Sequence, residues 1–217
     1  YWKMGCCGSK ENTKRTEESE PLAPGDTTND GVQPLRTLPA GAVKHHCHHV
    51  YDGDTLTLDD RRRVRFLGID TPELKEKEPF AEEARDLTHR FCHKQDIWLL
   101  MGEEGEDKYG RLLALVYAKT DGGFLCVNEA LVHAGFAGYY SVGNKPPNAA
   151  SLLRLQRNAR ERGAGMWRGF SDIDVVVTPN GRCFHTAACE HVAKIRHLRT
   201  LRKSAAIDDG LSSCRDC

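Results

Sequence analysis

The 217-residue chain has no excess of charge of either sign and no long apolar run. Lysine and arginine total 31 and aspartate and glutamate total 31, so bulk charge does not indicate a nucleic-acid partner, which usually requires a basic excess. No segment approaches the roughly 18 apolar residues of a membrane span, and the apolar region of a secretory signal is missing. The length fits one ordinary domain with appendages.

The nine cysteines are an odd number, and they cluster at the two ends of the chain. Only Cys47, Cys92 and Cys126 lie between the clusters. This distribution favours terminal modification and metal binding over a disulfide framework. We therefore expect a reducing, intracellular compartment.

The pattern along the chain predicts three parts. Residues 1–41 are rich in Gly, Thr, Glu, Pro and Asp without periodicity, which is typical of a disordered tail. Residues 42–170 form the predicted central domain, and residues 171–217 form a small C-terminal module. In the central domain we expect strands at His49–Leu58, Arg63–Ile69, Asp96–Met101 and Arg111–Ala118, and helices from about Pro79, at Val127–Ala134 and at Ala149–Arg162. The order predicts a mainly β fold with α, a five-stranded OB-type barrel with about three flanking helices.

Four motifs follow one another within the central domain. They are Asp52-Gly53-Asp54-Thr55, Arg65, Asp70-Thr71-Pro72-Glu73 and Asp107-Lys108-Tyr109-Gly110-Arg111. Taken singly, they are typical of a turn, a helix cap or a charged hairpin. Together they supply two spaced carboxylates, a base-capable glutamate and two guanidinium groups. Those are the parts needed to hydrolyse a phosphodiester with a hard divalent cation.

The motifs resemble those of the staphylococcal (thermonuclease-type) nuclease family in identity, order and approximate spacing, from about Val43 to Trp167. The resemblance implies the OB-type barrel and an endonuclease that cuts DNA, RNA or both. It implies Ca²⁺ as the cofactor, with Mg²⁺ as the alternative. The rival interpretation is a catalytically weak module that binds nucleic acid or protein and acts as a membrane-anchored adaptor.

The resemblance also implies a role for each matching residue. Metal ligation falls to Asp54, Asp70 and the Thr71 backbone carbonyl, with Asp52 in support. Glu73 prepares the attacking water, and Arg65 and Arg111 grip the phosphate. Contacts to the rest of the substrate fall to Lys108, Tyr109 and Tyr139.

Two features depart from the family pattern. Glu103, Glu104, Glu106 and Asp107 make the loop before Arg111 acidic, where a phosphate has to approach. Tyr139 and Tyr140 are adjacent, whereas the family separates its two base-stacking tyrosines by one residue. Only one of them is assigned to stacking, Tyr139, with an ordinary surface or core tyrosine as the alternative.

Near the start, Gly5-Cys6-Cys7-Gly8-Ser9 follows Met4. If Met4 is the initiator, Gly5 is a myristoylation acceptor and Cys6 and Cys7 are palmitoylation acceptors. Two such signals would tether the protein to the cytoplasmic face of a membrane. The preceding Tyr1-Trp2-Lys3 would instead leave Gly5 internal, and a cytoplasmic protein with an accidental Cys-Cys pair is the alternative.

The C-terminal module contains His185-x₃-Cys189 and Cys214-x₂-Cys217 after a strand at 175–177. One histidine and three cysteines are the ligands of a tetrahedral structural zinc, with Cys183 as an alternative to His185. A flexible tail with unbound thiols is the other possibility. Between the pairs, residues 191–203 predict a basic amphipathic helix, for nucleic acid, anionic lipid or solvent.

A histidine run, His45-His46-Cys47-His48-His49, lies before the first motif. Alternate residues of a strand face opposite sides, so these four histidines cannot converge on one ion without distortion. We do not assign a metal to them.

Overall fold

The computed structural model of the protein describes residues 31–140 and 145–217. Most of the predicted tail, including Gly5, Cys6 and Cys7, lies outside this range. Residues 31–41 do lie within it, and Leu35 exchanges two 2.8 Å backbone hydrogen bonds with Phe124. Part of the segment 31–41 therefore pairs with the segment around Phe124.

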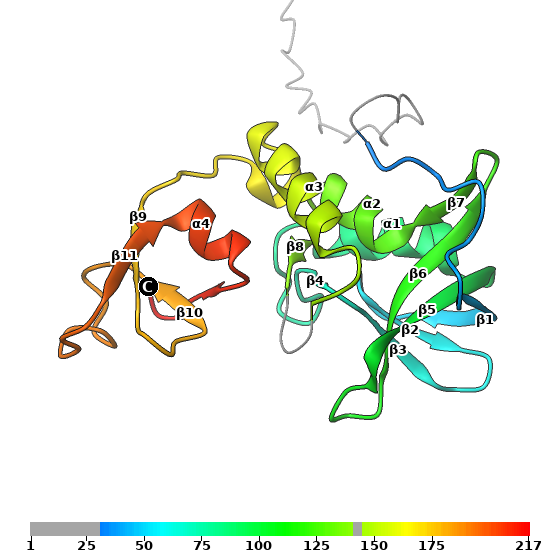
Figure 1. Cartoon of the computed structure of the whole chain (residues 1–217), viewed down its shortest axis with the longest axis horizontal. Coiled ribbons are helices and arrows are strands. Elements are labelled where there is room, and N and C mark those ends of the chain that lie inside the picture. The colour runs from blue at the N-terminus through cyan, green and yellow to red at the C-terminus, as the bar shows by residue number, and fades with distance from the viewer. Residues whose placement is uncertain (1–30, 141–144) are drawn as a thin grey trace, which may run out of the picture.

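Five strands close into a barrel, which confirms the predicted fold class (Figure 1). They are β1 (Val43–Val50), β2 (Thr55–Leu58), β3 (Arg63–Phe66), β5 (Asp96–Glu106) and β6 (Leu112–Thr120). Neighbours pair antiparallel in the order β3-β2-β1-β5-β6, and the parallel pair β3–β6 closes the ring. A further strand, β7 (Gly123–Cys126), extends the sheet beside β6.

Helices α1 (Ala81–Cys92), α2 (Val127–His133) and α3 (Ala149–Glu161) lie near the three predicted positions. Their apolar faces join the inward-facing strand residues in one core, in which Leu56, Phe66, Leu131 and Leu155 are at most 1 % exposed. Alternation along β2, β3, β5 and β6 explains why every second residue of these strands enters this core. A short 3-10 turn, η1 (Gly165–Trp167), follows α3.

Two predicted strands were wrong in their extent. The segment 49–58 is two strands, because the backbone turns at Asp52, whose Oδ1 accepts a 3.1 Å hydrogen bond from the Asp54 N–H. The segment 63–69 is interrupted at Gly68, which adopts φ of 79°. After it, the short β4 (Ile69–Asp70) pairs with β8 (Gly138–Tyr139) instead of with the barrel. Asp70 thereby lies beside β8.

The C-terminal part forms a second, four-stranded sheet. Its order is β11-β9-β10-β12, made from β9 (Asp174–Val177), β10 (Cys183–His185), β11 (Arg199–Arg202) and β12 (Ser212–Ser213). The predicted helix over 191–203 was wrong, because β11 pairs with β9 and the preceding residues form tight turns. Apolar residues at every third position match successive three-residue turns better than the 3.6-residue helical period. The helix here is α4 (Lys203–Asp208).

Side chains of α3 and α4 join the second sheet to the barrel. The Asp208 carboxylate forms ion pairs with Arg157 at 2.8 Å and with Arg160 at 3.0 Å. Gln156 links the two parts as well, donating to Asp208 at 2.9 Å while its Oε1 accepts from the Tyr139 N–H at 2.7 Å. In Figure 1 the second sheet lies on the side of the barrel where β4 and β8 are found. In the part of the chain that the structure describes, no helix has the length and apolarity to cross a membrane.

Candidate active site

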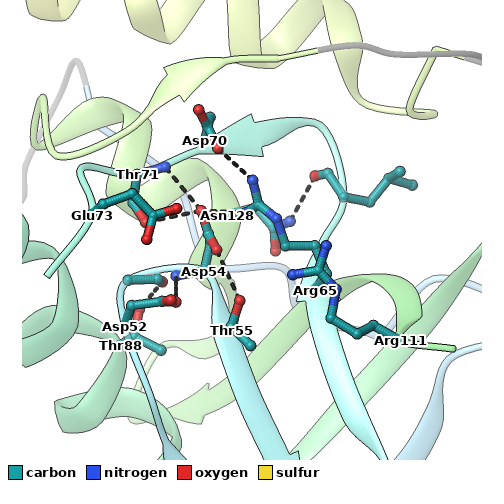
Figure 2. Close-up of polar contacts among 12 residues, drawn as sticks. Asp52, Asp54, Thr55, Arg65, Asp70, Thr71, Glu73, Thr88, Arg111 and Asn128 are labelled. Carbon is teal, nitrogen blue, oxygen red and sulfur yellow. Dashed lines mark hydrogen bonds and ion pairs between the residues drawn. The ribbon is translucent and has the colours of Figure 1, made fainter. Parts of the chain in front are cut away.

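The turn between β1 and β2 holds the best-buried carboxylate of the predicted site. Asp54 is 5 % exposed and accepts hydrogen bonds on both oxygens. Thr55 Oγ1 donates to Oδ1 at 3.1 Å, and the Thr71 N–H and Oγ1 both donate to Oδ2 at 2.9 Å (Figure 2). These bonds fix the orientation of the carboxylate.

Arg65, on β3, lies between two of the predicted metal ligands. Its guanidinium forms ion pairs with Asp54 and with Asp70, the latter at 2.5 Å, as the dashed line in Figure 2 shows. The Arg65 side chain is only 13 % exposed. The structure thus brings Asp54, Asp70 and Arg65 together as the sequence predicts, with the arginine compensating the charge of both acids.

Two further carboxylates lie close by. Burial raises the pKa of Asp52 to about 6, and repulsion from the nearby Asp54 and Glu73 contributes to the shift. Carboxylate oxygens that lie near one another suit a divalent cation, because the cation offsets the repulsion between the acids. The donor set therefore fits a hard cation such as Ca²⁺. The Thr71 N–H and hydroxyl both donate hydrogen bonds to Asp54. Ligation of the metal by the Thr71 backbone carbonyl stays a prediction.

Arg111 lies on the wall of a groove of about 450 Å³ that also contains Arg65. Asp107 holds it in place: Arg111 Nε donates to Asp107 at 2.7 Å, and the Arg111 N–H donates at 3.0 Å. Partial burial acts to raise the pKa of Asp107, but these hydrogen bonds outweigh it and lower the pKa. Asp107 is therefore a partner of the arginine, whereas Glu104 and Glu106 line the groove as acids.

The predicted substrate contacts are only partly found at the groove. Lys108 and Tyr109 line it, and Tyr109 is 71 % exposed. Tyr139 packs in the barrel core at 7 % exposure, whereas Tyr140 is 39 % exposed and lines the groove. Tyr139 is therefore a core tyrosine, which was the alternative to base stacking, and the accessible ring is that of Tyr140. Tyr139 is the last residue of β8, and Tyr140 follows the strand.

Soft ligands converge at a separate place. The ligand atoms of His185, Cys189, Cys214 and Cys217 all lie within 4.8 Å of one another. His185 Nδ1 is 3.4 Å from Cys189 Sγ and 3.9 Å from Cys217 Sγ, whereas Cys183 Sγ lies by the other ring nitrogen, Nε2. Two segments, 185–189 and 214–217, therefore supply one four-ligand cluster although they lie far apart in the sequence.

The histidine run on β1 has other partners. His46 Nδ1 is 3.1 Å from Asp96 Oδ1, and His48 Nδ1 is 3.6 Å from Asp59 Oδ1. These contacts connect the histidines to different elements.

Comparison with known proteins agrees with the geometry. The profile of a family described as "Staphylococcal nuclease homologue" matches residues 63–169. An uncharacterized endonuclease of Escherichia coli O157:H7 is 35 % identical over 130 residues, which cover 58 % of this chain and 76 % of that protein. The chain belongs to the staphylococcal nuclease homologue family. The family's thermonuclease of Staphylococcus hyicus is 35 % identical over 95 residues, 41 % of this chain and 54 % of its own length. The micrococcal nuclease of Shigella flexneri is 31 % identical over 126 residues, 54 % and 70 % of the two chains.

Sequence reasoning missed several residues of this nuclease-homologue site. Thr88 on α1 is fully buried and donates a 2.5 Å hydrogen bond to the Gly53 carbonyl, across 35 residues of sequence. Thr55 Oγ1 donates to Asp54, and Arg182, which directly precedes β10, lines the groove. Thr88 and Arg182 carry no local signal, since only the tertiary fold brings them to the site.

Close packing at Gly53 provides a test of how the site is held. A Cβ added there would lie 2.7 Å from both Ala84 Cβ and Thr71 Cγ2, so Gly53→Ala must displace the turn that carries Asp54. We expect the free energy of unfolding to fall by about 1–3 kcal/mol, the usual cost of overpacking. Chemical denaturation measures this. The matched control is Gly122→Ala, where the nearest atom is Pro34 Cγ at 3.5 Å and we expect little change. Equal effects of the two substitutions would contradict the account.

Proposed function

We propose that this protein is a divalent-cation-dependent endonuclease that hydrolyses phosphodiester bonds of DNA, RNA or both. The observation that carries the proposal is the placement of Arg65 between Asp54 and Asp70, beside a groove that also contains Arg111. Acids for a cation and arginines for a phosphate within one site are what phosphodiester hydrolysis requires. The nucleases among its relatives support the same conclusion.

The cation-binding residues would be Asp54 and Asp70, with the Thr71 carbonyl and, in support, Asp52. Ca²⁺ is the favoured cation and Mg²⁺ the alternative, because carboxylate and carbonyl oxygens are hard ligands. A bound cation would supply positive charge against the phosphate oxygens. Thr55 and Thr71 keep the Asp54 carboxylate oriented for it.

The remaining chemistry belongs to the protein's own side chains. Glu73 is exposed and close enough to Asp52 to affect its pKa, and we assign it to orienting a water and accepting its proton. The guanidinium groups of Arg65 and Arg111 each donate to phosphate oxygens and stabilise the charge that grows as the bond to the leaving oxygen breaks. Asp107 holds Arg111 in a fixed orientation for this purpose.

Cleavage of single-stranded DNA and RNA by the purified chain, in Ca²⁺, in Mg²⁺ and with chelator, tests the proposal. Losing one charge-stabilising donor typically costs about 10²–10³ in rate, so we expect Arg111→Ala to lower the cleavage rate by that factor. We expect Glu73→Gln to lower the cleavage rate by about 10²–10⁴, the usual contribution of a general base. Initial rates at saturating substrate give both numbers.

Matched controls lie close by in the chain. Arg63→Ala removes an arginine whose guanidinium packs over Tyr51, 4.6 Å from its ring centre, and Glu76→Gln removes an exposed acid next to the site. Both should cut like the native protein. Absence of cutting by folded, metal-supplemented native protein would instead favour a nucleic-acid or protein-binding adaptor.

For the C-terminal cluster we propose one structural Zn²⁺, held by His185, Cys189, Cys214 and Cys217. Three thiolates and one imidazole are a standard tetrahedral zinc set, and their convergence within 4.8 Å supports it. The ion would join β10 to the end of the chain, which otherwise holds together through small hydrophobic clusters.

Metal analysis of cysteine variants tests the zinc site. Cys214→Ser should lose the single equivalent of zinc that the native chain carries and should melt at a lower temperature, because a structural metal contributes directly to folding. Cys183→Ser, a change of a neighbouring thiol outside the cluster, should keep the metal. Loss of zinc from the Cys183 variant alone would favour the alternative in which Cys183 replaces His185 as a ligand. A native protein without zinc would contradict the proposal.

Membrane tethering through Gly5, Cys6 and Cys7 stays a prediction, since these residues lie outside the described range. It would place the enzyme at the cytoplasmic face of a membrane. Labelling of a chain started at Met4 with a myristate analogue decides it, and an unlabelled product would remove the tether.

A further inference from the structure

The second sheet borders the candidate active site. Arg182, just before β10, lines the 450 Å³ groove together with Arg65 and Arg111. Tyr140 lines the same groove and also a second cavity of about 320 Å³. That cavity is bounded on the barrel side by Asp70 and on the other by residues of the second sheet and α4, among them Phe184 and Lys203. The second cavity therefore lies between the two parts of the molecule, the groove includes Arg182 from the C-terminal part, and Tyr140 lines both.

The contact between the two parts is built from well-buried groups. Asp208 and Arg160 are 13 % and 12 % exposed at the side chain, and Arg157 adds a second ion pair to the same carboxylate. Lys203 Nζ lies 5.3 Å from the centre of the Phe170 ring. Charged groups that are withdrawn from water and paired lose much stability when one partner is removed. The second sheet is thus held against the barrel.

The guanidinium of Arg182 has no assigned use inside the protein. In the ranges 31–140 and 145–217, no ion pair or side-chain hydrogen bond involves this exposed guanidinium, whereas its carbonyl accepts a 3.2 Å hydrogen bond from the Ser212 N–H. The β10–β12 pairing therefore fixes the backbone and leaves the side chain available. The groove lining holds Arg65, Lys108, Arg111 and Arg182 beside Glu104, Glu106 and Asp107, so cations exceed acids by one. This excess matches a polyanion that extends beyond one phosphate.

We propose that the second sheet forms the far wall of the substrate groove and that Arg182 binds a phosphate of a single-stranded nucleic acid other than the phosphate that is cut. The proposal rests on the proposed function for the identity of the ligand. The cavity beyond Tyr140, with Trp167 and Phe170 in its lining, offers an apolar space for a base of the same strand. One ligand of the zinc cluster, His185, belongs to β10, which begins directly after Arg182.

Binding measured without cleavage tests this inference. The full chain carrying Glu73→Gln is titrated with a fluorescent oligonucleotide of about 16 nucleotides in Ca²⁺, and anisotropy is recorded between about 50 and 200 mM salt. Adding Arg182→Ala should weaken binding about tenfold and reduce the slope of log K against log salt by about 0.7, the value for one phosphate contact with a single strand. Arg182→Lys should retain the native slope, because the charge is kept.

The matched control is Arg196→Ala in the same background. Arg196 is an exposed arginine of the same module that does not line the groove, so its removal should leave affinity and slope unchanged. Equal zinc content in all variants shows that the second sheet is intact. If Arg182→Ala and Arg196→Ala behave alike, the inference is overturned.

The same experiment separates this inference from the proposed function. If the native protein cuts nucleic acid but Arg182→Ala does not weaken binding, the inference about Arg182 is rejected and the proposed nuclease function stands. If the native protein does not cut but binding depends on Arg182, the nuclease function is rejected and the inference about strand binding stands. Absence of binding by every variant contradicts the inference.

Discussion

The ion pairs of Arg65 with Asp54 and Asp70 are the interaction on which the rest of the site depends. Each of the three residues comes from a different element: the β1–β2 turn, β3, and the short β4. Strand pairing brings the first two together, since Thr55 is opposite Arg65 in the β2–β3 ladder. Arg65 and Asp54 are both buried, and leaving one member of a buried ion pair without its partner typically costs about 3–5 kcal/mol. The Asp70 side chain is 58 % exposed, so its pair with Arg65 contributes less.

This arrangement implies a competition within the proposed mechanism. The carboxylates that would bind a cation are already paired with the guanidinium that would bind the phosphate. Cation binding to the acids would free the arginine for substrate, so each ligand would favour the binding of the other. Arg111, tied to Asp107 instead, stays oriented toward the groove independently of the metal. The two arginines thus differ in what holds them.

The local motifs could be predicted from the sequence because each one keeps its chemistry within a few residues. Asp54, Asp70 and Arg65 meet as expected, and the barrel follows the predicted order of strands. The failures occurred where tertiary contacts decide. Every third residue of 191–203 is apolar, yet the segment ends as a strand paired with β9. Tyr139 enters the core while Tyr140 does not, and Thr88 reaches the site across 35 residues. These outcomes depend on neighbours that are remote in sequence.

The most direct test of the account is a calorimetric titration of the substrate-free chain with Ca²⁺, comparing the native protein with Arg65→Ala and Asp54→Asn. We expect the native protein to bind one ion at this site and Asp54→Asn to lose it. Arg65→Ala should bind the ion more tightly, because a competing positive charge has been removed from the acids. Circular dichroism spectra verify that each variant is folded. Absence of Ca²⁺ binding by the native protein, or weaker binding by Arg65→Ala, would contradict the claim that these acids form a cation site opposed by the arginine.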